Sequence, residues 1–156
     1  MQELIYRHID ESCTDSMSAI WADWDVIRYT SIVEPCTREK IKCRIKKLMK
    51  LDVFVVIKDS DIIGIVGCPF VDREKLQFGL FYQLKKSVWG HGYATAAVKW
   101  MLDYMEKTYG KTTVFADVIT ANTASEKILI NCGFNCLSEE EITHKGCSEI
   151  IRHYVL

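Results

Sequence analysis

The feature that most constrains this chain is a loop with two glycines, Trp89-Gly90-His91-Gly92-Tyr93-Ala94-Thr95. Apolar residues between 76 and 84 predict a strand before it, and apolar residues at helical spacing from Ala94 to Met105 predict a helix after it. Glycine allows the backbone to turn so that several N–H groups point to one place. These groups would lie at a helix N-terminus, which favours an anion. The loop therefore predicts a phosphate or pyrophosphate cradle, with a tight turn that binds nothing as the alternative.

Two common nucleotide-binding loops do not match this sequence. A P-loop needs Lys followed by Ser or Thr directly after its last glycine, whereas Tyr93 and Ala94 follow Gly92. A dinucleotide-binding turn needs a third small residue where Thr95 stands, and it lies near the start of its domain. The loop therefore indicates another kind of anion site.

Length and composition indicate one domain, residues 1–156, of a soluble protein. Hydrophobic residues make up 49% of the chain and charged residues 26%, which are globular values. No apolar run could span a membrane, and the first residues do not resemble a signal peptide. Seven cysteines without a Cys-x-x-Cys pair argue against a zinc site or a disulfide framework and favour a cytoplasmic location. A net charge of −1 argues against a dedicated nucleic-acid binder.

Hydrophobic periodicity and turn signals predict a mixed order of strands and helices. The expected strands are 3–9, 52–58, 62–71, 76–84, 112–119 and two that flank Lys145-Gly146. The expected helices are 15–22, 37–50, 94–109 and 123–132. This order predicts an α/β (mixed α+β) protein with a mixed central sheet and helices on both faces.

Three spaced motifs resemble the GCN5-related N-acetyltransferase (GNAT) superfamily. The loop at 89–95 resembles its motif A, Gln/Arg-x-x-Gly-x-Gly/Ala, in the form of the branch that contains ribosomal-protein N-terminal acetyltransferases. Asp25-Val26-Ile27-Arg28-Tyr29 resembles an early motif of this branch. Asn122-Thr123-Ala124-Ser125, followed by Cys132-Gly133-Phe134, resembles its Asn-x-x-Ser helix. The resemblance covers nearly the whole chain and implies a GNAT fold whose fourth and fifth strands splay apart to admit the cofactor.

The resemblance also implies an activity and a set of contacts. An acetyl group would move from acetyl-CoA to a primary amine (a protein N-terminus, a polyamine or a small-molecule amine) by direct transfer in a ternary complex. The pyrophosphate would lie on the glycine loop and the pantetheine along the preceding strand. The cofactor-binding residues expected on this basis are Tyr82, Gln83, Leu84, Trp89, Gly90, His91, Gly92, Tyr93, Ala94, Thr95, Asn122 and Ser125. The sequence is compatible with a homodimer.

The acid and base residues depart from the family pattern. Ser87 stands where motif A has Gln or Arg, Gly79 where the motif strand often has glutamate, and Leu129 where many members have a tyrosine general acid. Ser125 is the candidate for a contact with the departing thiolate, with helix capping as the alternative. Glu141, in a run of three glutamates, is the candidate general base or amine ligand, with a solvated edge as the alternative.

Two other functions stay open at the level of sequence. The missing glutamate and tyrosine motivate a CoA-binding sensor or interaction module without transfer activity. The helix 37–50 carries seven basic residues around an apolar stripe, which indicates a solvated amphipathic face, with docking of an acidic partner such as RNA as the alternative. Trp21, Trp24 and Tyr29 predict core packing near the first helix, with an aromatic pocket for the acceptor as the alternative.

Overall fold

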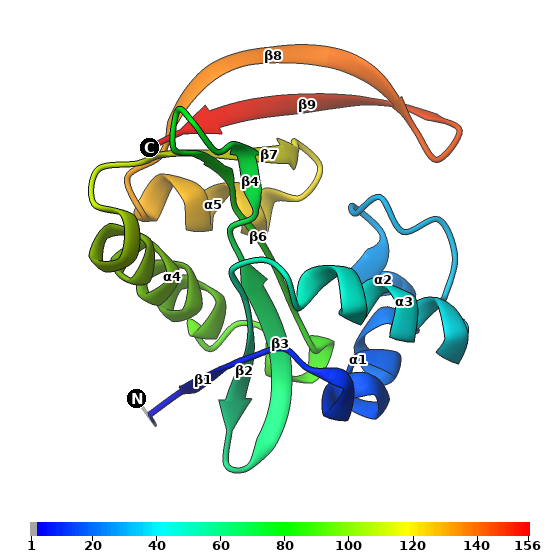
Figure 1. The fold of residues 1–156 in the computed structure, drawn as a ribbon. Coiled ribbons are helices and arrows are strands. Elements are labelled where there is room, and N and C mark those ends of the chain that lie inside the picture. Colours follow the sequence, from blue (N-terminus) through cyan, green and yellow to red (C-terminus); the bar gives the residue numbers. More distant parts are fainter. Residues whose placement is uncertain (1–2) are drawn as a thin grey trace.

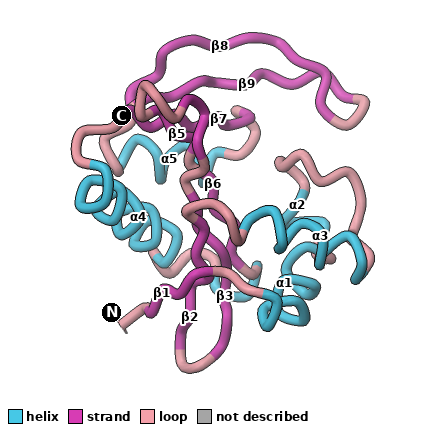
Figure 2. The backbone as a smooth tube through the Cα atoms, in the orientation of Figure 1, coloured by secondary structure: helices cyan, strands magenta, loops and turns pink. Residues whose placement is uncertain are grey.

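The computed structural model describes residues 3–156, which form two twisted sheets with helices packed against them (Figures 1 and 2). The strands are β1 (Ile5–His8), β2 (Val53–Lys58), β3 (Asp61–Gly67), β4 (Phe70–Asp72), β5 (Gln77–Gly79), β6 (Phe81–Leu84), β7 (Thr113–Ile119), β8 (Asn135–His144) and β9 (Cys147–Val155). The α-helices are α1 (Thr14–Trp21), α2 (Trp24–Ile27), α3 (Arg38–Leu48), α4 (Tyr93–Tyr109) and α5 (Thr123–Asn131). One sheet has the order β1-β2-β3-β6, and the other has the order β4-β5-β7-β9-β8.

Strand β2 shows why helices cover both faces of the first sheet. Side chains alternate across a strand, and every residue from Val53 to Val56 is at most 4% exposed. Val53 and Val55 pack in a core with α1 and α3, whereas Phe54 and Val56 pack in a second core with α4. The predicted arrangement of helices on both faces is therefore confirmed.

The two sheets separate at Leu80, inside the strand predicted at 76–84. The Leu80 N–H donates to the Phe115 carbonyl at 2.8 Å and extends the parallel pairing of β5 with β7. The next residues, which form β6, pair instead with β3. The predicted splay is thus confirmed. The sequence predicted a single strand here, but the structure shows one segment that passes from the second sheet into the first.

Three further segments differ from the sequence expectation or refine it. The strand expected at 62–71 is interrupted at Pro69, which has no N–H to donate, and becomes β3 and β4. The short helix α2 occupies what was expected as a loop, and the Asp23 side chain caps it by accepting from the Asp25 N–H at 3.0 Å. The hairpin at Lys145-Gly146 forms as predicted, with positive φ at both residues.

The tip of this hairpin touches the N-terminal part of the chain. The Lys145 ammonium donates to the carbonyls of Ile27 (2.7 Å) and Arg28 (3.1 Å) at the end of α2. The hairpin β8–β9 therefore arches from the second sheet across to α2 (Figure 1). Among the helices of the described residues, none is long and apolar enough to span a membrane.

Candidate active site

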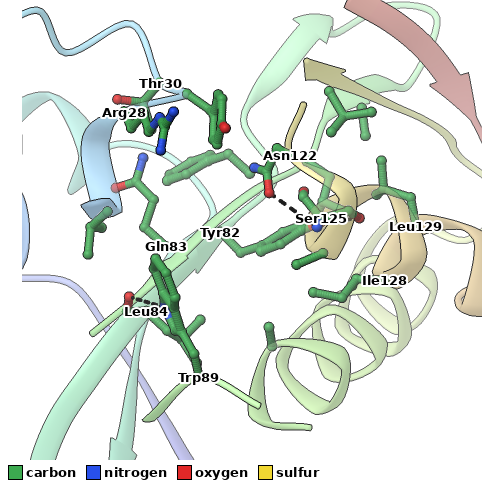
Figure 3. A pocket seen from close by; sticks show the side chains of 18 of the residues that line it. Arg28, Thr30, Tyr82, Gln83, Leu84, Trp89, Asn122, Ser125, Ile128 and Leu129 are labelled. Atoms are coloured by element: carbon green, nitrogen blue, oxygen red, sulfur yellow. Dashed lines mark hydrogen bonds between the residues drawn. The ribbon is translucent and has the colours of Figure 1, made fainter. Parts of the chain in front are cut away.

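A cavity of about 1020 Å³ opens where β6 and β7 diverge. Its walls come from β6, β7, the start of α4, the length of α5, and the region from α1 to α3. Figure 3 shows Tyr82 and Gln83 in the middle of this cavity, with Asn122 and Ser125 on one wall and Arg28 and Thr30 on another. The cavity therefore brings together all three motifs found in the sequence.

The edge of β6 that faces the cavity carries backbone hydrogen-bonding groups. The Lys85 N–H donates to Ile63 of β3 at 2.8 Å, whereas the Leu84 carbonyl accepts from the Trp89 indole on the opposite edge at 2.9 Å. Backbone groups of successive residues point to opposite edges of a strand. The amides of Tyr82 and Leu84 therefore face the cavity.

The glycine loop presents a second set of backbone donors. Gly90 and Gly92 have φ of 78° and 81°, so both use the left-handed region that favours glycine. The first turn of α4 contains no acidic residue, and Gly92 offers no side chain to cap it. The amides of residues 93–95 precede the first helical bond, from the Ala96 N–H to the Gly92 carbonyl, and so have no partner inside α4. The helix α4 has 17 residues, and its uncapped N-terminus suits a phosphate group.

All but one of the predicted cofactor-binding residues line the cavity. The exception is His91, which is exposed, stacks on the Tyr93 ring and lies with Nδ1 3.2 Å from the Val88 carbonyl. The ring of His91 therefore lies outside the cavity.

Tyr82 and Ser125 meet across the cavity. The Tyr82 hydroxyl lies 2.7 Å from the Ser125 hydroxyl and donates to the Ser125 carbonyl at 3.2 Å. Burial raises the pKa of Tyr82 to about 12. The Asn122 side chain accepts from the Ser125 N–H at 3.3 Å, so Asn122 caps α5. The sequence did not indicate Tyr82 as the partner of Ser125.

The carboxylates near the cavity are arranged differently from the prediction. Glu141 accepts from the Ser148 hydroxyl at 2.5 Å and lines a separate hollow of the β8–β9 hairpin, not the main cavity. Asp117 of β7 does line the main cavity, and its Oδ1 lies 2.6 Å from Nδ1 of His153. The other ring nitrogen of His153 lies 3.0 Å from a Glu140 carboxylate oxygen.

The two carboxylates determine the state of His153. A carboxylate only accepts, so both contacts form together when the imidazole carries two protons. Hydrogen bonds to Asp117 and then Glu140 accordingly raise the pKa of His153. Asp117 was missed because a single acidic residue in an apolar strand resembles an exposed edge position; its pairing with His153 is visible only in the register of β7 and β9.

The aromatic residues near α1 divide into two groups. Trp21 is 1% exposed, and its indole donates to the Gln83 side chain at 2.6 Å, so it packs in the core and also borders the cavity. Tyr29 lines the cavity. Trp24 does not line it; this residue is 49% exposed, and its ring centroid lies 4.9 Å from the Lys145 ammonium. Across the described range 3–156, no three His, Cys, Asp or Glu side chains are grouped to hold a metal.

Comparison with known proteins identifies the family. A model of the GNAT acetyltransferase domain matches residues 3–135. An N-acetyltransferase of Bacillus licheniformis called p20, itself described as uncharacterized, is 25% identical over 141 residues, which cover 85% of this chain and 79% of that protein.

Solved structures share the fold at lower identity. RimL, a ribosomal L7/L12 alpha-N-protein acetyltransferase in complex with coenzyme A, has a TM-score of 0.90 and 11% identity over 100% of this chain and 94% of its own. The spermidine N-acetyltransferase of Vibrio cholerae, in complex with CoA and spermine, has a TM-score of 0.87 and 16% identity over 98% and 94%. The motifs, the splayed strands and the family match agree, and the chain therefore belongs to the GNAT superfamily of acetyl-CoA-dependent acetyltransferases.

Proposed function

We propose that this enzyme transfers the acetyl group of acetyl-CoA to a primary amine by direct attack in a ternary complex. The observation that carries the proposal is the cavity between β6 and β7, whose walls include the uncapped start of α4, the cavity-facing amides of β6 and the carboxylate of Asp117. Each of these groups suits one requirement of acyl transfer: binding an anion, polarising a carbonyl and accepting an amine proton.

Two sets of backbone amides bind the acyl donor in this proposal. When bound, acetyl-CoA supplies an acetyl group activated as a thioester. The amides of residues 90–95 hold its pyrophosphate at the start of α4. The amides of Tyr82 and Leu84 hold the pantetheine, and one of them polarises the acetyl carbonyl as negative charge develops on its oxygen. Direct transfer agrees with the lining of the cavity, which contains no cysteine among residues 3–156.

In this proposal Asp117 is the general base, in place of Glu141, which was the candidate from sequence. The Asp117 carboxylate borders the cavity and uses Oδ1 for its bond to His153. The second oxygen, Oδ2, is left to accept a hydrogen bond from the amine. As the C–N bond forms, positive charge develops on the nitrogen, and Asp117 stabilises that charge and takes the proton.

Tyr82 and Ser125 serve the leaving group in this proposal. The departing thiolate needs a hydrogen-bond donor, and the two hydroxyls lie 2.7 Å apart on opposite sides of the splay. With a pKa raised to about 12, Tyr82 keeps its proton at neutral pH. Ser125 is thus a candidate donor to the sulfur, and Tyr82 is placed to donate to Ser125 in turn. Tyr82 would then supply the tyrosine hydroxyl that many family members have at the position of Leu129.

Enzymes that share this fold act on different acceptors. A spermidine acetyltransferase and a ribosomal-protein N-terminal acetyltransferase both share this architecture. The test is release of CoA from acetyl-CoA with spermidine, benzylamine, amino acids and short peptides with free N-termini. Chromatographic detection of CoA avoids interference from the seven free cysteines. Release with any primary amine supports the transferase, whereas tight acetyl-CoA binding without release from any amine favours the sensor.

A further inference from the structure

Two arginines line the active-site cavity without a carboxylate partner. Arg28, directly after α2, and Arg44, on α3, both border it. Within residues 3–156, neither guanidinium lies within ion-pair distance of Asp or Glu. Each lies instead against an aromatic ring that also borders the cavity: Arg28 at 5.1 Å from the Tyr29 centroid and Arg44 at 5.3 Å from that of Trp21.

The fold directs both residues to this place. Arg44 lies three residues after Ile41 and four before Leu48, so it shares their face of α3 and is half-buried, unlike the exposed Lys46 and Lys47. This corrects the expectation that the basic residues of this helix form one solvated face. The Arg28 carbonyl accepts from Lys145 (3.1 Å) and lies 3.2 Å from a ring nitrogen of His144, so the hairpin tip holds the Arg28 backbone.

Each of the two carboxylates that line the cavity already has a cationic partner. Asp25 accepts from the Lys86 ammonium at 2.5 Å, and Asp117 is bonded to His153. Neither Arg28 nor Arg44 lies within ion-pair distance of these two carboxylates, and both bring positive charge to the cavity wall. Figure 3 places Arg28 beside Thr30, on the side of Gln83 and away from Ser125. The arginines come from the α2–α3 side of the sheet, whereas the phosphate cradle belongs to α4.

We propose that the acceptor carries a carboxylate in addition to its amine, and that Arg28 and Arg44 bind this carboxylate. Arginine is suited to the task because its planar guanidinium makes two parallel hydrogen bonds to a carboxylate. The inference rests on the proposed transferase function and specifies its acceptor. Free amino acids and peptides with acidic residues near the N-terminus both offer this chemistry, whereas a polyamine places further positive charge next to the arginines.

The test compares pairs of acceptors in which one or two carboxylates are replaced by amides. Leucine and glutamate are paired with leucinamide and glutamine, and the peptide amide Ser-Glu-Glu-Ala is paired with Ser-Gln-Gln-Ala. The inference predicts at least a tenfold higher kcat/KM for the carboxylate member of at least one pair. A preference among the free amino acids identifies a small-molecule acceptor, and a preference among the peptides identifies a protein N-terminus.

Variants of the two arginines show whether they cause the preference. Arg28→Gln and Arg44→Gln should each lower kcat/KM for the preferred acceptor by tenfold or more and change it less than twofold for its amide partner. Lys47→Gln removes one charge from the exposed face of the same helix and should leave the preference unchanged. Calorimetry should give unchanged acetyl-CoA affinity in all three variants.

Three results would overturn the inference. They are equal turnover of both members of every pair, a preference for spermidine over all carboxylate-bearing amines, and a carboxylate preference that survives both arginine substitutions. In each case CoA is still released, so the proposed function stands. Absence of CoA release with every amine contradicts the proposed function and the inference together.

Discussion

The Tyr82 hydroxyl of β6 lies 2.7 Å from the Ser125 hydroxyl at the start of α5. β6 belongs to the first sheet and α5 follows β7 of the second, so this contact spans the opening between the two sheets. Tyr82 is a strand residue expected only to line the cofactor path, yet its side chain makes the polar contact across that path. The proposed mechanism uses this pair of hydroxyls as the hydrogen-bond donors to the leaving thiolate.

Tyr82→Phe should lower kcat by about 10²-fold, as expected for loss of a proton donor, and change the acetyl-CoA dissociation constant less than about twofold. The control is Tyr109→Phe, which removes a hydroxyl bonded to Asp52 outside the cavity. Steady-state kinetics and calorimetry measure the two effects. An unchanged kcat in Tyr82→Phe would show that the thiolate is protonated from elsewhere.

Asp117→Asn should lower kcat/KM for the acceptor at least about tenfold while leaving acetyl-CoA affinity unchanged, because the amide cannot take the amine proton. Glu149→Gln, a charge change of the same size on β9 outside the main cavity, is the control. If Asp117→Asn keeps full activity and Glu141→Gln loses it, the base is Glu141, as the sequence first suggested.

His153 should make stability depend on pH. Its pKa is raised above 6.5 in the folded protein by Asp117 and then Glu140. A group whose pKa rises on folding stabilises fully below its unfolded pKa, and the contribution is lost as pH rises through the folded value. His153→Gln should therefore lower the free energy of unfolding more at about pH 6 than at about pH 9. Urea denaturation at both pH values measures this, with His91→Gln as control; an equal loss at both would contradict the assigned charge.

Gly64→Ala should displace β6, which forms one wall of the cavity. A Cβ at Gly64 would lie 2.5 Å from the Gln83 carbonyl and 2.9 Å from the Leu84 Cα, both backbone atoms of β6. We expect a loss of about 1 to 3 kcal/mol in the free energy of unfolding and weaker acetyl-CoA binding. Gly79→Ala is the matched control, since its Cβ would meet only a Val71 methyl at 3.5 Å. Equal stability of the two variants would contradict the packing of β3 against β6.

Features set by local chemistry could be predicted from the sequence. The α4 helix follows from its apolar stripe, and its end follows from Gly110, which has φ of 75°. The cap of α3 follows from Thr37, whose side chain accepts from the Lys40 N–H. The turn of the glycine loop could be predicted because both of its glycines have positive φ, a conformation that glycine adopts more easily than other residues.

Features set by pairing between distant segments could not be predicted in the same way. Leu80 divides one apolar segment, whose first part pairs with β7 and whose second part pairs with β3. Both parts have the same apolar pattern, so the sequence does not reveal the change of partner. Asp117 and His153 are 36 residues apart and meet only through strand register. Helical spacing puts Arg44 on the face of Ile41 and Leu48, but its contact with the Trp21 ring depends on how α3 packs against α1. Such contacts arise from topology, which periodicity does not encode.

The most direct test of the cavity as an acetyl-CoA site is calorimetric titration of acetyl-CoA into the wild-type protein and into Gly92→Glu. Gly92 has φ of 81° at the start of α4, and a glutamate there would bring negative charge to the amides that hold pyrophosphate. Gly92→Ala shares the backbone strain without the charge. We predict binding at one site per chain in the wild type, retained binding in Gly92→Ala and none in Gly92→Glu, with NAD not bound by any of them. Unchanged affinity in a folded Gly92→Glu, or no binding by the folded wild type, would contradict the assignment of this cavity.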